Sequence, residues 1–311
     1  ARLLTEETSY SFTATGDCGI YAFYHAAENL SAAGTANCYI APKRQSGYRF
    51  DAHVTGNGRA TTGIAPDNLY GTRAKVIWET GPTRGAVIRA VHCLNSEICF
   101  TTGTAPGNAL IGLFDERDNC LWSWHIWAAD YDPVATAQDY TGGRTFMDRN
   151  LGALSADCTQ AAAKGLYYQW GRKDPFCGGT ATETSATAFA QAAENSVVNP
   201  AFADTHAWKQ ESGAAVSTLE YAAAHPLSFL SNKGATGVYD WLAKPRADLW
   251  NTAKTCYDPC PVGYKVPDRD TWDDFADEQD RYVDGTSEWD GEKYGMTYIF
   301  GDLRDWYPTS G

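Results

Sequence analysis

This chain of 311 residues has little positive charge and no long apolar run. Its 25 Lys and Arg are outnumbered by 38 Asp and Glu, which gives a net charge of −13. Nucleic acids and anionic membrane surfaces attract clustered Lys and Arg, so the acidic balance argues against both as partners. No apolar stretch approaches the roughly 18–20 residues of a membrane-spanning helix, so we expect no membrane insertion. The sequence shows no signal peptide, and we interpret its start at Ala1 as a mature or trimmed end.

Catalytic motifs are missing as well. The sequence has no Gly-x-Ser-x-Gly, no phosphate-binding loop with Gly-Lys-Ser/Thr and no His-Glu-x-x-His. We therefore predict that the protein is not an enzyme. His125 lies inside a tryptophan-rich strand, where a satisfied core histidine is expected rather than a general base. The acidic run Asp268–Asp280 offers oxygen ligands for Ca²⁺, but its spacing does not match a calcium loop. We favour a solvated helix face there and expect no cofactor.

Nine cysteines allow up to four disulfides and one odd thiol. Two pairs are near in sequence: the spacing of Cys93 and Cys99 suits the closing of a hairpin, and that of Cys256 and Cys260 suits a tight loop. No Cys-x2-Cys pair or suitably spaced histidine predicts a zinc site. The pairing itself does not follow from the sequence.

The most informative stretch is Leu121–Trp127, which holds three of the eleven tryptophans. At a period of two, Trp122, Trp124 and Ile126 share one face, and the residues between them share the other. Both faces are largely apolar, so the pattern predicts a strand with little exposure to water. Ala109–Asp115 precedes it as a second strand, and the polar loop between them predicts a hairpin.

Strand patterns recur every 8–15 residues between residues 36 and 135, with turn signals and no helical period. This spacing predicts an antiparallel, immunoglobulin-like β-sandwich after a leading segment at residues 1–35. The strand pattern is lost between Asp130 and Thr145, where we place a domain boundary. The expected strands besides the hairpin are Asn37–Ile40, Gly47–Phe50, Lys75–Glu79, Val87–His92 and Glu97–Thr102.

Residues 136–311 have a mixed pattern, which makes the predicted fold α+β overall. Thr159 is a candidate cap for a short helix at Gln160–Trp170, and Ser217-x-x-Glu220 is a capping box for a second helix that ends before Pro226. Thr271–Val283 has the clearest helical period, with Trp272 and Phe275 on its apolar face. Residues 178–205 give the weakest core signal and predict a long surface loop.

Aromatic residues supply the candidate ligand-binding site. Sugars stack on aromatic rings while carboxylates and amides hold their hydroxyl groups. The tryptophans in loop-like sequence with acidic or amide neighbours are Trp208, Trp241, Trp250, Trp289 and Trp306. From this set we select Trp208, Trp241, Trp289 and Asp290 as ligand-binding residues. Arg149, Arg172 and Asp174 lie among aromatics, and we interpret them as a buried structural network.

Several motifs carry a family resemblance over about residues 30–311. The segments Asn37–Ile40, Val76–Glu79 and Leu121–Trp127 resemble the β-domain of cell-surface and fimbrial-tip proteins of Bacteroidetes. Met147–Ala153, Gly165–Phe176 and Tyr257–Pro267 resemble the Fibrobacter major paralogous domain, which is similar to the formylglycine-generating-enzyme and C-type-lectin-like fold. Against that family the second domain looks incomplete at its C-terminus, and Cys260 lacks the late cysteine that is its usual partner.

The resemblance implies a non-enzymatic adhesin outside the cell, at the cell surface or in a fimbrium. It would be a fimbrial tip or tip-like subunit that contacts other fimbrial subunits and binds a glycan or protein ligand. One alternative is a structural or assembly module of a surface fibre without a ligand of its own. A remote alternative is an oxidase or hydrolase of the formylglycine-enzyme fold, whose paired catalytic cysteines would belong to the missing region.

Overall fold

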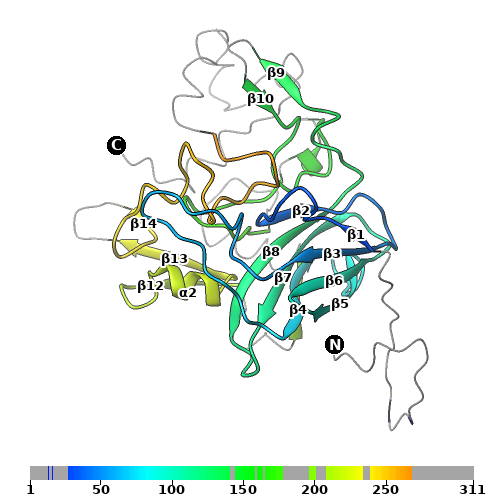
Figure 1. The fold of residues 1–311 in the computed structure, drawn as a ribbon, viewed down its shortest axis with the longest axis horizontal. Helices are drawn as coiled ribbons and strands as arrows, with labels where there is room; N and C mark the ends of the chain where they lie inside the picture. Colours follow the sequence, from blue (N-terminus) through cyan, green and yellow to red (C-terminus); the bar gives the residue numbers. More distant parts are fainter. Residues whose placement is uncertain are drawn as a thin grey trace.

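The computed structural model describes residues 27–140, 144–157, 160–163, 165–177, 196–200, 208–233 and 239–267, together with Thr13 and Gly16. This part of the chain is mostly β, with mixed sheets (Figure 1). Its helical elements are one short α-helix, α2 (Leu219–Ala224), and a 3-10 turn, η1 (Ala161–Ala163). The expected α+β class is therefore corrected to a mostly β fold for the described residues. The helix predicted at 271–283 lies outside them.

Two sheets form the body of the molecule. The four-stranded sheet has the order β1-β3-β6-β5, and the five-stranded sheet has the order β11-β4-β7-β8-β2. The strands of the first are β1 (Glu28–Asn29), β3 (Gly47–Asp51), β5 (Ile88–Leu94) and β6 (Glu97–Thr102). Those of the second are β2 (Cys38–Ile40), β4 (Arg73–Thr80), β7 (Gly107–Phe114), β8 (Cys120–Ala128) and β11 (Ser196–Val198). All five strands expected besides the hairpin are present, shifted by at most two residues at either end.

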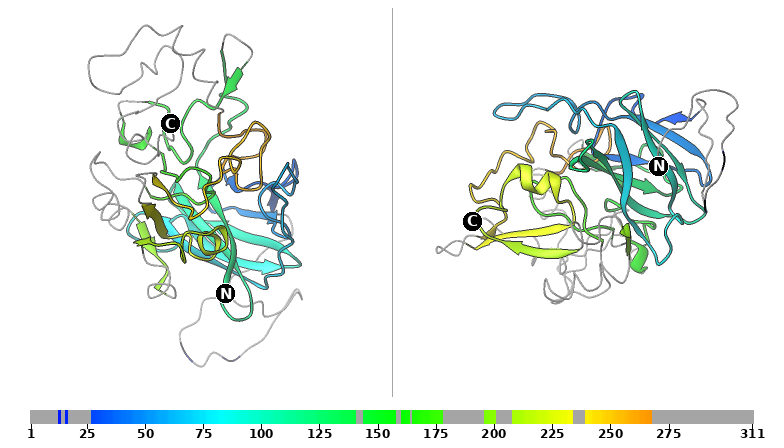
Figure 2. Two further views of the ribbon diagram at one scale, coloured as in Figure 1. Left: turned by 90° about the vertical axis from the view of Figure 1, so that its left-hand side faces the viewer. Right: turned by 90° about the horizontal axis from the view of Figure 1, so that it is seen from below.

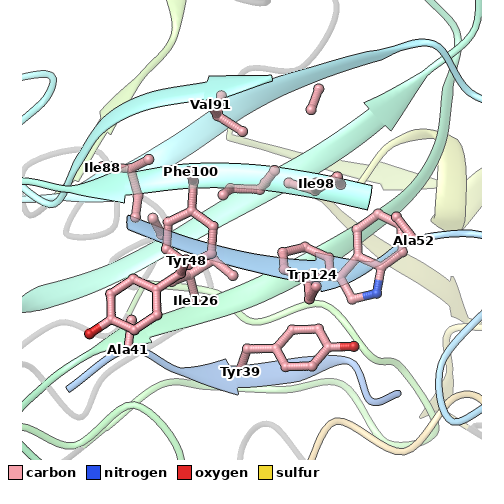
Figure 3. Close-up of a cluster of buried hydrophobic side chains, with 14 of the residues drawn as sticks. Tyr39, Ala41, Tyr48, Ala52, Ile88, Val91, Ile98, Phe100, Trp124 and Ile126 are labelled. Carbon is pink, nitrogen blue, oxygen red and sulfur yellow. The ribbon is translucent and has the colours of Figure 1, made fainter. Parts of the chain in front are cut away.

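The two sheets bury a shared apolar core. Figure 3 shows Tyr48, Ile98 and Phe100 of the four-stranded sheet close to Trp124 and Ile126 of the five-stranded sheet. Phe50 joins them, with its ring centroid 5.4 Å from that of Trp124. The alternating residues of each strand thus form one continuous interior, as the sandwich prediction requires.

The hairpin β7–β8 is confirmed as the best-buried part of the sheet. All eight residues of β7 are buried, and Leu121 alone among the nine residues of β8 is only partly buried. Trp122, Trp124 and Ile126 belong to the core between the sheets. The other face of β8 carries Ser123, His125 and Trp127, which are buried as well. Both faces of this strand therefore lie against protein.

The predicted antiparallel pairing needs a correction, because both sheets are mixed. β2 runs parallel to β8, with Cys38 opposite His125, and β1 runs parallel to β3. The hairpin-linked neighbours β5–β6 and β7–β8 are antiparallel, as a short loop demands. β2 is separated from β8 by about eighty residues, so no tight turn fixes its direction, and alternation along a strand carries no information about direction.

The second half of the chain covers the outer face of the five-stranded sheet. Its three-stranded sheet has the order β12-β13-β14 and consists of β12 (Lys209–Ser212), β13 (Ser228–Lys233) and β14 (Tyr239–Asp240). Figure 1 and Figure 2 show this sheet and α2 beside the sandwich, with the hairpin of β9 (Gln138–Tyr140) and β10 (Arg144–Phe146) at another end. β11 adds to the edge of the sandwich sheet by pairing with β4. It lies within the loop predicted at 178–205, so that prediction is wrong for residues 196–198.

Two helix predictions are corrected by the structure. The helix predicted before Pro226 forms as α2, but its N-cap is Thr218 and not Ser217: the Thr218 side chain accepts a hydrogen bond from the Tyr221 amide at 3.1 Å. The helix expected at Gln160–Trp170 shortens to η1. Gly165 has a φ of +73°, which a helix does not tolerate, and Tyr167 instead bridges Phe176 in extended conformation. The domain boundary near residues 130–145 stays a prediction.

Candidate functional site

Trp241, a predicted ligand-binding residue, is 5% exposed and belongs to the apolar cluster under α2. Its indole Nε1 donates to the Trp170 carbonyl oxygen at 2.6 Å. A cavity of about 10 Å³ beside Trp241 is lined also by Arg172, Asp174 and Tyr257. That volume suits about one water molecule, so Trp241 offers no sugar-sized space in this structure.

Trp208, a second predicted residue, packs between the two halves of the chain. Its ring centroid lies 5.6 Å from that of Trp78 in β4 and 5.8 Å from that of Phe176. Its Nε1 donates to Ser196 Oγ at 3.0 Å. The ring therefore covers the outer face of the sandwich sheet. Trp289 and Asp290, together with Trp306 and the acidic run at 268–280, lie outside the described residues.

A buried ionic cluster forms where the second half meets β8. Ser123 Oγ donates to Asp174 Oδ1 at 2.6 Å, and Lys173 Nζ donates to Ser123 Oγ at 2.7 Å and to the same Asp174 oxygen. The Lys173 ammonium also lies 4.3 Å from the Trp122 ring centroid. Burial lowers the pKa of Lys173, and Asp174 opposes that shift. A buried charge is tolerated only when it is paired and hydrogen-bonded, and this arrangement meets that condition.

Arg172 ties the same cluster to α2 and β13. Its guanidinium donates to the Ser228 carbonyl at 2.5 Å, to the His225 carbonyl at 2.9 Å and to Gln169 Oε1 at 2.9 Å. Burial lowers the pKa of Arg172 to about 10, against the effect of Asp174, so the side chain keeps its charge at neutral pH. The charge sits at the carboxyl end of α2, where the helix dipole favours a cation. The predicted structural network of Arg172 and Asp174 is confirmed.

His125 is the satisfied core histidine that the sequence predicts. Its Nε2 lies 2.9 Å from Asn108 Oδ1, and Asn108 Nδ2 donates to the Gly152 carbonyl at 2.9 Å. Because Asn108 Oδ1 is an acceptor, Nε2 carries the proton. Nδ1 then accepts from the Tyr168 hydroxyl at 3.4 Å. Burial lowers the pKa of His125 to about 3, so the ring is neutral at pH 7.

The chemistry that this cluster supports is structural. Ser123, Lys173 and Asp174 resemble a nucleophile with its base, but they are 1–3% exposed, and a substrate has no access to the Ser123 hydroxyl. Arg149, the third residue of the predicted network, stacks on Tyr131 with 4.2 Å between the guanidinium carbon and the ring centroid, and pairs with Asp148. Within the described ranges, no three His, Cys, Asp or Glu side chains come together as metal ligands.

Trp170 is an exposed tryptophan that was not among the residues selected from the sequence. It is 36% exposed, whereas the other tryptophans of the described part are buried or partly buried. Its ring packs on Trp250 with a centroid distance of 5.0 Å. The motif Gln169-Trp170-Gly171 carried a usable signal: Gly171 has a φ of +77° and its α-carbon packs on Leu249. A side chain at position 171 would collide with Leu249, so the glycine marks a turn next to Trp170.

Across the described residues, no helix is long and apolar enough to cross a membrane. Comparisons with known proteins add no assignment: no protein-family model, no curated protein and no solved structure matches this chain.

Proposed function

We propose that this protein is a non-enzymatic, extracellular cell-surface adhesin, a fimbrial tip or tip-like subunit that binds a glycan or protein ligand. The proposal includes the finer fold, an immunoglobulin-like sandwich followed by a C-type-lectin-like domain. The resemblance of the tryptophan-rich strand and the Gln-Trp-Gly-Arg-Lys-Asp-Pro-Phe motif to surface proteins supports both parts. The single structural observation that carries the binding function is the exposed ring of Trp170.

Trp170 has the properties of a rigid binding platform. Its backbone carbonyl is held by the Trp241 indole at 2.6 Å, and its ring leans on the buried Trp250. A fixed aromatic ring loses little conformational freedom when a ligand binds, which preserves affinity. The Arg246–Asp248 ion pair, about one-third exposed, lies on the segment just before Trp250. Sugar recognition combines an aromatic face with polar hydrogen-bonding groups, and Trp170 supplies the aromatic face.

The test compares wild type and Trp170→Ala on one panel of glycans and host cells. We expect wild type to bind a subset of the panel and Trp170→Ala to lose at least about tenfold in affinity, which corresponds to about 1.4 kcal/mol. Trp170→Phe should retain part of the binding because it keeps an aromatic face. Tyr70→Ala is the matched control, since Tyr70 is 83% exposed and lies on a different loop. Unchanged binding by Trp170→Ala would contradict the platform.

The burial of Trp208 and Trp241 favours a second function, a structural or assembly module of a surface fibre. Both residues were expected to face a ligand, and both instead contribute to cores that join parts of the chain. In that case the wild-type protein binds nothing on the panel but is incorporated into a fibre. Incorporation is measured by immunogold labelling of fibres from cells that express a tagged chain. Ligand binding by the isolated protein would reject this alternative.

A further inference from the structure

Strand β2 directs Cys38 away from the core of the sandwich. Tyr39 belongs to the core between the sheets and stacks on Phe50 with 4.4 Å between ring centroids. Successive side chains of a strand point to opposite faces, so Cys38 lies on the outer face, in the cluster with Trp127, Ala129 and Tyr131. Its thiol is therefore directed toward the second half of the chain.

Asn37, the residue before Cys38, holds a distant loop against this face. Its Nδ2 donates to the Cys256 carbonyl at 2.7 Å and to the Asp258 carbonyl at 2.8 Å. Its Oδ1 accepts from Trp122 Nε1 at 2.9 Å. The Asn37 side chain is 1% exposed, and its amide nitrogen and oxygen are both hydrogen-bonded. Asn37 therefore fixes residues 256–258 beside the start of β2. Cys260 follows two residues later.

The loop that carries Cys260 is rigid because Lys254 and Asp258 organise it. Lys254 Nζ donates to Asp258 Oδ1, to the Cys260 carbonyl, each at 2.8 Å, and to the Tyr264 carbonyl at 2.6 Å. Asp258 Oδ1 also accepts from the Cys260 amide at 2.9 Å. Both backbone polar groups of Cys260 are thus held in place, and its side chain is 4% exposed.

The pKa values of the two thiols are shifted by the same groups. Burial is the main cause that raises the pKa of each, and the charge of Lys254 lowers the pKa of both. Cys38 also raises the pKa of Cys260, in keeping with the two hydrogen bonds by which Asn37 holds residues 256–258 against the start of β2. Lys254, which donates to the Cys260 carbonyl, thus acts on the pKa of both cysteines.

We propose that Cys38 and Cys260, thiols in this structure, become joined by a disulfide that fastens β2 to the loop at residues 254–266. The two thiols lose two protons and two electrons as the S–S bond forms. A disulfide-type oxidant, such as a thiol oxidase or oxidised glutathione, accepts these electrons and becomes a dithiol or two thiols. This inference is independent of the proposed ligand binding.

The pair Cys93 and Cys99, which is near in sequence, does not fit a disulfide. In the β5–β6 hairpin, Cys93 lies opposite Ile98, and His92 lies opposite Cys99. Cys93 packs on the sandwich core, so the pleat directs Cys99 to the other face. A disulfide between them would require both side chains on the same face of the hairpin, and the register places them on opposite faces. Cys93 and Cys99 therefore serve as internal controls for the chemical test.

The reactivity of the buried thiols indicates when the bond forms. Thiolate is the attacking species in disulfide formation. Because burial suppresses the thiolate of both cysteines in the folded state, we infer that oxidation occurs during folding, before the loop closes over β2. Once formed, the bond is shielded from reductant by the same burial.

The test maps the thiols of protein made in an oxidising compartment. The protein is alkylated with iodoacetamide in denaturant without reductant, digested and analysed by mass spectrometry. We expect the Cys38 and Cys260 peptides as one linked species, two hydrogens lighter than their sum, which reductant separates. Cys93 and Cys99 should be alkylated. Alkylated Cys38 and Cys260, or a link from either to another cysteine, would overturn the proposal.

Thermal unfolding supplies a second readout. Cys38→Ser and Cys260→Ser should each lower the melting temperature by roughly 5 °C or more, as expected for the loss of a disulfide that closes a long loop. The double variant should fall no further than either single variant, because the first substitution already removes the bond. Additive losses would argue against a bond between them, even if each variant is less stable. Cys93→Ser provides the matched control.

Discussion

At the scale of single residues, the outward face of β8 decides how the two halves of the chain meet. Ser123 and His125 are polar side chains on an otherwise apolar strand, and both are about 1% exposed. Each is matched by groups from beyond residue 140: Asp174 and Lys173 at Ser123, and Tyr168 at His125. Buried polar groups without partners cost about 1–3 kcal/mol each, so these contacts select one arrangement of the second half on the sheet.

The neutral state of His125 predicts an acid-sensitive stability. Burial depresses the pKa from its ordinary value of 6.5 to about 3, so the unfolded chain takes up a proton at higher pH than the folded chain. The stability that depends on a neutral His125 is fully present above pH 6.5 and is lost as the pH falls toward 3. The free energy of unfolding should decline by about 1.4 kcal/mol per pH unit from this group alone.

Urea unfolding at pH 7, 6, 5 and 4 checks this expectation in wild type and His125→Gln. We expect the variant to be less stable at pH 7 and to show a shallower decline below pH 6.5. His92→Gln is the comparison, because His92 is also buried and its pKa is also lowered by burial. In that variant the part of the decline in unfolding free energy that comes from His125 should remain. Parallel pH profiles for wild type and His125→Gln would contradict the assignment of a neutral, buried imidazole.

At the scale of elements, α2 shows how a correct pattern can name the wrong cap. Ser217 and Thr218 are adjacent, and the spacing to Glu220 favours Ser217 as the capping residue. In the structure Thr218 has the extended backbone of an N-cap, with φ of −131° and ψ of 160°, while Ser217 is buried. The apolar face of the helix fixes its rotation against the core under Trp241, and that rotation decides which hydroxyl reaches a free amide.

The two hydroxyls provide a direct comparison. Thr218→Ala should lower the free energy of unfolding by about 1 kcal/mol through loss of the cap. Ser217→Ala should change it by less than about 0.5 kcal/mol, since Ser217 Oγ makes no hydrogen bond in the structure. Chemical denaturation of both variants measures the difference. A larger loss for Ser217→Ala than for Thr218→Ala would restore the cap predicted from the capping box.

At the scale of the whole molecule, the five-stranded sheet is covered on both faces. Its inner face packs on the four-stranded sheet, and its outer face carries Trp78, Leu110 and Phe114, all fully buried. The cover of that outer face includes Cys177 and Leu227 from the second half. A one-sided sandwich sheet usually alternates apolar and polar residues, and the tryptophan-rich strand departs from that alternation because protein lies on both of its faces.

This packing predicts that the sandwich is weak without its cover. A fragment of residues 27–135 would expose Trp78, Leu110 and Phe114, whose burial is worth roughly 1.5–3 kcal/mol each. We expect the fragment to bind a hydrophobic dye such as ANS and to unfold at a lower urea concentration than the whole chain, which should bind little dye. A fragment with native near-ultraviolet circular dichroism and no dye binding would instead support an independent domain that ends near the predicted boundary.

The sequence by itself determined where the strands of residues 38–128 lie, because alternation and turn residues are local properties. β6 at Glu97–Thr102 matches its expected range, and the hairpin β7–β8 is as buried as its two apolar faces indicate. It also determined that His125, Arg172 and Asp174 belong to the interior, since polar groups within strongly apolar sequence need partners. The prediction of Gln160–Trp170 as a helix failed because a tertiary bridge to Phe176 overrode a weak local preference.

Only the tertiary structure decided which tryptophans are buried and in which direction the edge strands run. Trp170 and Trp241 are the same residue type, yet Trp170 is 36% exposed and Trp241 is 5% exposed. Trp241 packs with Ala222, Leu230 and Leu249, which lie on separate segments of the chain, and its indole donates to the Trp170 carbonyl about seventy residues away. β2 likewise pairs parallel with β8, and Asn37 at its start is hydrogen-bonded to the Cys256 carbonyl more than two hundred residues away. Contacts between segments so far apart follow from how the whole chain packs, which no local pattern records.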